Sequence, residues 1–149
     1  MHGFYLERRA LPMNTPLSKD LVQHIFTRGA KGSVVVVSEK PQDLAAIAKK
    51  QWHVMNRLVQ RERASTLKLA RIAELSNQIR WMERMSFIAK PIEELPDYSI
   101  IFATAEALVL KPPICSTLYI TQEVTDEQFH FMTSWLHSDS IVVIYGKYV

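Results

Sequence analysis

A small α/β domain, built as a mainly parallel sheet flanked by helices, is the fold that this sequence predicts. Residues 34–37, 98–103 and 141–144 are three largely apolar stretches of strand length, which suits strands covered on both faces. Helical segments separate them, as the crossover connections of a parallel sheet require. The alternative is an α+β ferredoxin-like βαββαβ arrangement, but its sheet has one open face and would require alternating polarity in every strand.

The first helix is expected at residues 16–28. Thr15 and Pro16 have the pattern of an N-cap followed by proline at the first helical position. The apolar residues that then recur at helical spacing are Leu17, Leu21 and Ile25. Four consecutive valines at 34–37 form the first expected strand.

Beyond its first residue, the segment 41–85 contains no proline and no glycine, so all of it is compatible with helix. As a single helix it would extend roughly 67 Å, several times the ~15 Å radius of gyration of a domain of this size. Ser65 and Thr66 can cap a new helix. We therefore expect a helical hairpin, residues 41–63 and 66–85, which is inserted after the first strand and protrudes as a contact element.

Residues 117–121 alternate apolar and polar side chains, which is typical of an edge strand with one face in water. Thr125 and Gln128 have the spacing of a capping box and begin the last helix. The residues expected on its inner face are Phe129, Met132 and Leu136. A loop at 90–97 contains two prolines, but the strands and single helix after it would bury too little surface to be stable alone. One domain is therefore expected to span residues 1–149.

Charge is distributed unevenly along the chain. Residues 1–90 carry 16 Lys and Arg against 7 Asp and Glu, a net charge of +9. Residues 91–149 carry 2 against 8, a net charge of −6. A polarity of this kind indicates one surface made for an acidic partner.

The candidate contact surface is a basic stripe on the first helix of the hairpin. Lys50, Arg57 and Arg61 fall within about 40° of one another on a helical wheel, opposite the apolar face of that helix. Cations at this spacing can neutralise successive phosphates, and a neighbouring aromatic ring can stack on an unpaired base. The candidate binding residues are Lys50, Trp52, His53, Arg57, Arg61, Lys68, Arg71, Arg80, Trp81 and Arg84.

These patterns favour a non-enzymatic binding protein, a subunit or accessory factor of a macromolecular complex, whose basic helical surface contacts nucleic acid or an acidic protein. Two alternatives remain open. One is a small enzyme with a pocket near the strand ends that uses Cys115, His130 or Glu106, although a buried packing role for Cys115 and a turn between strands for Glu106 are the simpler interpretations. The other is a homo-oligomer in which the basic half of one copy meets the acidic half of the next.

No cofactor or metal motif stands out, and none is expected to be bound. The loop at 29–33 contains two glycines, but it follows a helix and precedes a strand, the reverse of the order in a phosphate-binding loop. The five histidines include no i, i+4 pair of the kind found in zinc helices. A single cysteine and the absence of an apolar signal segment favour a cytoplasmic protein, and the longest apolar stretch is too short to cross a membrane as a helix.

Overall fold

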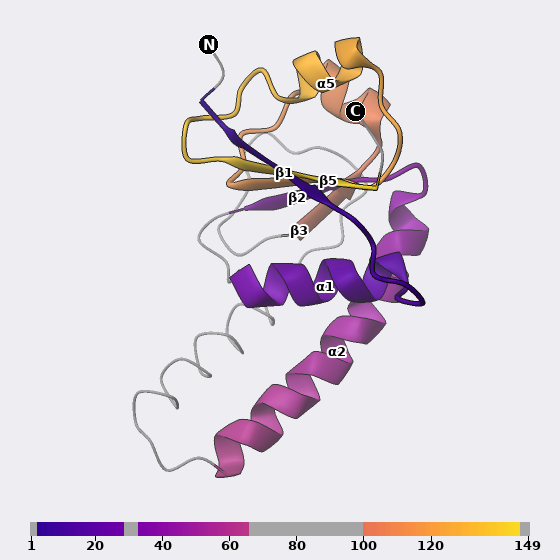
Figure 1. The fold of residues 1–149 in the computed structure, drawn as a ribbon, viewed down its shortest axis with the longest axis vertical. Coiled ribbons are helices and arrows are strands. Elements are labelled where there is room, and N and C mark those ends of the chain that lie inside the picture. Colours follow the sequence, from indigo (N-terminus) through magenta and orange to yellow (C-terminus); the bar gives the residue numbers. More distant parts are fainter. Residues whose placement is uncertain (1–2, 29–32, 66–99, 147–149) are drawn as a thin grey trace.

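The computed structural model describes residues 3–28, 33–65 and 100–146. Over these residues the protein forms a five-stranded, all-parallel sheet with helices packed on both faces (Figure 1). The elements in chain order are β1 (Tyr5–Arg9), α1 (Leu17–Arg28), β2 (Val34–Val37), α2 (Pro41–Ser65), β3 (Ile100–Ala103), α4 (Ala105–Leu110), β4 (Thr117–Ile120), α5 (Asp126–Met132) and β5 (Ile141–Tyr145). The predicted α/β fold with a parallel sheet is confirmed, and the ferredoxin-like alternative is not the fold.

The sheet, in the order β1-β5-β4-β2-β3, separates two hydrophobic cores. Alternate side chains of a strand point to opposite faces. Val34 and Val36 of β2 therefore pack with residues of α1 and α2, whereas Val35 and Val37 pack with residues of α4 and α5. In Figure 1, α1 and α2 accordingly lie on one side of the sheet and α5 on the other.

β4 lies at the centre of the sheet, between β5 and β2, and all four of its residues are buried. The prediction of an edge strand with one wet face was wrong. The polar groups that suggested water are satisfied inside the protein: the Tyr119 hydroxyl lies 2.7 Å from His24 Nδ1, and the Thr121 hydroxyl donates to the Val37 carbonyl at 2.7 Å. A central strand can therefore alternate in polarity if its polar atoms find partners.

β1 and α4 were not predicted. Among the described strands, β1 lies at an edge and pairs only with β5. Its side chains are exposed or half-buried, so it lacks the apolar run that marks the other strands. Because β1 comes first, the long helix α2 follows the second strand of the chain and not the first. α4 is a helix of only 6 residues, capped by the Thr104 hydroxyl, which accepts from the Ala107 amide at 3.2 Å.

α2 begins at Pro41, as predicted, and continues to Ser65. Its buried stripe is Ala45, Ala48 and Trp52, which packs in the core shared with α1 and β3. Beyond α1, the C-terminal half of α2 extends away from the sheet (Figure 1). The second helix of the expected hairpin, at 66–85, lies outside the described residues.

The remaining predictions near the C-terminus are confirmed, except that α5 ends at Met132 and Leu136 lies beyond the helix. Thr125 and Gln128 form the capping box of α5, with bonds of 3.1 Å from the Gln128 amide to the Thr125 hydroxyl and 3.0 Å from the Thr125 amide to Gln128 Oε1. Met132 is fully buried, and Phe129 and Leu136 pack partly buried against the same core. In the described part of the chain, no helix combines the length and the hydropathy that crossing a membrane requires.

Candidate functional site

The outer face of α2 carries the described members of the predicted basic stripe. Lys50, His53, Arg57 and Arg61 are all exposed. The other candidates from the expected second helix, which are Lys68, Arg71, Arg80, Trp81 and Arg84, lie outside the described residues. The described part of the basic surface is therefore the outer face of α2.

Trp52 does not belong to this surface. Its side chain is only 3% exposed and lies in the core between α1 and α2, where its ring meets that of Phe26 edge-on at a centroid distance of 6.5 Å. An indole in this position cannot stack on an unpaired base. The sequence suggested otherwise because Trp52 adjoins His53, but neighbours in a helix point about 100° apart.

Apolar side chains accompany the cations on the outer face. Ile47, Val54 and Leu58 are 49%, 44% and 55% exposed. They are separated by seven and four residues, so they form one stripe along the helix. Helix positions three apart are neighbours, and each apolar residue is followed three positions later by a cation, namely Lys50, Arg57 and Arg61.

This mixed surface differs from the predicted one, in which the cations lay opposite the apolar face. The helix has two apolar stripes, and the one that is buried contains alanines and Trp52. Hydrophobicity alone favours Ile47 and Leu58 as the buried residues. The signal that could have identified the buried stripe is the small size of Ala45 and Ala48, which lets α2 approach its neighbours closely.

The cations of the stripe have no acidic partner within the described ranges. The ion pair there joins Arg9 to Asp20, and the Glu7 carboxylate lies 2.9 Å from the imidazole of His24; both contacts lie between β1 and α1. Among the described residues, none neutralises the charge of Lys50, Arg57 or Arg61.

A buried polar cluster under α1 centres on Asp20. The Arg9 guanidinium donates to Asp20 from Nε at 2.6 Å and from Nη2 at 3.0 Å, and the Tyr145 hydroxyl donates to Asp20 at 2.9 Å. The hydrogen bond from Arg9 is the main reason that the pKa of Asp20 is lowered. Burial, and then the bond to Asp20, raise the pKa of Tyr145, so its hydroxyl remains a donor.

A second polar cluster joins Glu7, His24 and Tyr119. His24 lies between the Tyr119 hydroxyl, 2.7 Å from Nδ1, and the Glu7 carboxylate, 2.9 Å from Nε2. A histidine between a carboxylate and a hydroxyl is the arrangement of an activated nucleophile. Here, however, Tyr119 has no exposed surface, so a substrate cannot reach its oxygen. Both clusters instead fasten β1 and α1 to the centre of the sheet.

The residues named for the enzyme alternative are one buried thiol and two exposed side chains. Cys115 is 1% exposed in the core beneath α4 and α5, and burial raises the pKa of its thiol to about 12, so the nucleophilic thiolate is not formed near neutral pH. Glu106 is exposed in the first turn of α4, and His130 is exposed on α5. None of the three lines the cavity at the carboxyl ends of β2 and β4.

No protein-family model, no curated protein and no solved structure matches this chain. Among the described residues, no group of three His, Cys, Asp or Glu side chains could hold a metal ion. The outer face of α2 is therefore the candidate site that the exposed residues of this chain support for a macromolecular partner.

Proposed function

We propose that the protein is a non-enzymatic binding protein, a subunit or accessory factor of a complex, and that the outer face of α2 contacts an acidic amphipathic helix of a partner protein. The observation that carries the proposal is the pairing of each exposed apolar residue with a cation three positions later on the same helix face. The extension of α2 beyond α1 supports it, because this part of the helix lies away from the sheet (Figure 1) and its side chains at Val54, Arg57 and Leu58 are exposed.

The apolar stripe favours a protein partner over nucleic acid. Ile47, Val54 and Leu58 would gain from apolar contact, which phosphates and sugars offer poorly, whereas an amphipathic helix lays an apolar face on such a stripe. Burial of Trp52 also removes from α2 the aromatic group that was expected to stack on a base there. Acidic residues that flank the partner's apolar face would pair with Lys50, Arg57 and Arg61 and would orient it.

The partner can be identified by cross-linking from α2 itself. A photoreactive amino acid replaces Val54 in the full chain inside its own cell, and the control carries it at Lys19, which is exposed on α1. A protein joined at position 54 and not at position 19 is then purified, and its affinity is measured against parent and variants at several salt concentrations.

Charge reversal and apolar truncation should both weaken this complex. Arg57→Glu should lower affinity by at least about tenfold, an effect of about 1.4 kcal/mol. Leu58→Ala should also lower it, because the stripe loses its most exposed member. Lys19→Glu, the matched reversal, should bind as the parent does, and all three variants should keep the parent's thermal unfolding temperature within a few degrees.

Other outcomes would decide against this proposal. If a 20-nucleotide DNA or RNA binds with a steep salt dependence that Arg57→Glu reduces and Leu58→Ala leaves unchanged, the partner is nucleic acid. If sedimentation shows salt-sensitive self-association that Arg57→Glu abolishes, the partner is a second copy of the chain. If a cross-linked protein binds parent and both variants equally, the outer face of α2 is only a solvated surface.

A further inference from the structure

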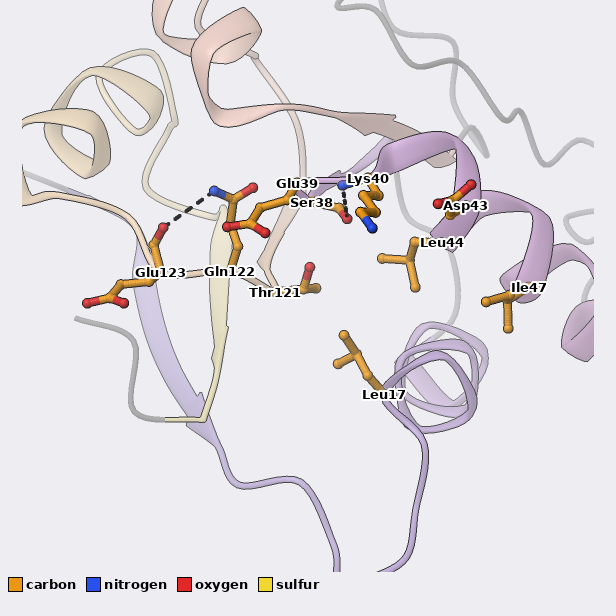
Figure 2. A pocket seen from close by; sticks show the side chains of 10 residues that line it. All are labelled: Leu17, Ser38, Glu39, Lys40, Asp43, Leu44, Ile47, Thr121, Gln122 and Glu123. Carbon is orange, nitrogen blue, oxygen red and sulfur yellow. Dashed lines mark hydrogen bonds between the residues drawn. The ribbon is translucent and has the colours of Figure 1, made fainter.

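A cavity of about 420 Å³ lies at the carboxyl ends of β2 and β4, and its lining residues are shown in Figure 2. Ser38, Glu39 and Lys40 follow β2 directly, and Thr121, Gln122 and Glu123 follow β4. The volume falls in the range of about 300–1,000 Å³ that is usual for small-molecule sites.

The position of the cavity in the sheet is where parallel α/β folds bind ligands. β2 and β4 are neighbours in the sheet. The next described strand in the chain after β2 is β3, which pairs with β2 on the side away from β4. The next strand after β4 is β5, which pairs with β4 on the side away from β2. The strand order therefore reverses between β2 and β4. Connections that leave in opposite directions at such a point open a crevice outside the carboxyl ends of the strands.

The cavity has an apolar wall and a polar wall. Leu17 of α1 and Leu44 and Ile47 of α2 form the apolar wall. In Figure 2 the Lys40 side chain extends toward this wall, whereas the carboxylates of Asp43 and Glu123 point away from it.

Of the four charged lining residues, three are acidic and Lys40 is basic, and the polar wall takes its negative group from Glu39 and its positive group from Lys40. The first turn of α2 also begins here, and its amides have no acceptor within the helix. One side of the polar wall thus favours an anion.

Gln122 provides a group that lacks a partner. Its Oε1 is buried and accepts no hydrogen bond from any residue in the described ranges, while its Nε2 makes only a 3.4 Å bond to the Glu123 carbonyl. Gln122 is itself a lining residue, and the terminal torsion of a glutamine side chain is soft, so its Oε1 can turn to meet a ligand. A ligand that donates a hydrogen bond there would relieve an unsatisfied acceptor.

We propose that this cavity binds a small zwitterion, an α-amino acid with an apolar side chain. Its carboxylate pairs with Lys40 at the start of α2, its ammonium donates to Gln122 Oε1 and faces Glu39, and its side chain packs on Leu17 and Leu44. Each of the three parts of the ligand thus meets a group that the cavity already presents. The inference goes beyond the proposed function and does not require it. Of the residues assigned to the outer face of α2, only Ile47 lines the cavity, whereas Arg57 and Leu58 do not.

The probe is L-leucine, titrated calorimetrically into the full chain. We expect saturable binding at one site and a thermal unfolding temperature that rises with leucine concentration. Three analogues each lack one part: 4-methylpentanoate lacks the ammonium, 3-methylbutylamine lacks the carboxylate, and glycine lacks the apolar side chain. Each should bind at least tenfold more weakly than leucine.

Variants then locate the site. Lys40→Met and Gln122→Leu should each weaken leucine binding at least tenfold, and Gln122→Glu, which keeps an acceptor, should retain it. Lys19→Met, at an exposed position of α1 that does not line the cavity, is the matched control and should bind as the parent does. Failure of leucine to saturate, equal binding of leucine and 4-methylpentanoate, or undiminished binding by a folded Gln122→Leu protein would each overturn the proposal. None of these results depends on the fate of the Arg57 and Leu58 variants, so the two proposals fail separately.

Discussion

Asp20 accepts three hydrogen bonds under α1, two from Arg9 of β1 and one from Tyr145 of β5. Its side chain is 3% exposed, so water cannot replace these donors. Asp20→Asn removes the charge and should lower the free energy of unfolding by about 2 kcal/mol at pH 7, because hydrogen bonds to charged groups contribute about 1.5–3 kcal/mol. Urea unfolding monitored by circular dichroism measures the change.

The pH dependence of the same variant provides a further check. Since the pKa of Asp20 is lowered in the folded state, its contribution is fully present above the unfolded value of about 3.9 and is lost as pH falls through the folded value. The stability difference between parent and Asp20→Asn should therefore be constant from pH 7 to about pH 5 and should shrink below about pH 4. A difference that stays the same at pH 3 would contradict this role of Asp20.

Cys115 is predicted to be chemically silent in the folded protein. With a pKa raised to about 12 and 1% exposure, it should not react with iodoacetamide at pH 8 unless urea is added. Cys115→Ala should lower the free energy of unfolding by about 1–2 kcal/mol, and Cys115→Ser by more, because the hydroxyl enters an apolar core. Rapid alkylation of the native protein would contradict the packing role.

At the scale of elements, local chemistry predicted the helices that have strong end signals. α1 begins after Thr15-Pro16, α2 begins at Pro41, and α5 begins with its capping box. These signals act within three or four residues, so they can be recognised without knowing the rest of the fold. α4 has only an N-cap and 6 residues, too few for a helical period to stand out.

The contribution of the α5 capping box to the free energy of unfolding should be measurable with a single substitution. Thr125→Ala removes the acceptor of the Gln128 amide and should lower the free energy of unfolding by about 1 kcal/mol. Thr27→Ala, at an exposed position inside α1, is the matched control and should change it by no more than about 0.5 kcal/mol. Equal urea midpoints for the two variants would show that the box contributes nothing.

At the scale of the whole molecule, the two polar clusters keep the edge strand β1 in its place on the sheet. Burial of its side chains alone would not do this. β1 pairs only with β5 and exposes most of its side chains, yet Glu7 and Arg9 connect it through α1 to β4 and β5. Hydrogen exchange should therefore be slowest in β2, β4 and β5, and faster in β1. In Asp20→Asn, exchange of the β1 amides should accelerate more than that of β4.

The control for this measurement is Asp139→Asn, an exposed aspartate in the loop before β5. It should leave the exchange of β1 unchanged. Uniform acceleration of all strands in Asp20→Asn would mean that the cluster stabilises the fold as a whole and does not hold β1 in particular.

The sequence by itself determined the α/β class, the buried strands around Val34, Ile100 and Ile141, and the helices with strong caps, because hydrophobic runs and capping patterns act locally. Only the tertiary structure decided the strand order, which places β4 at the centre and β1 at the edge, and which of the two apolar stripes of α2 is buried. It also brought Glu39 and Lys40 to Gln122, more than 80 residues further along the chain. The physical reason is that burial and hydrogen-bond partners are properties of pairs of elements. In the sequence Tyr119 has the alternation of a surface residue, but in the structure it is buried and its hydroxyl lies against His24. In the sequence Trp52 adjoins the basic stripe, but in the structure it packs in the core with residues of α1.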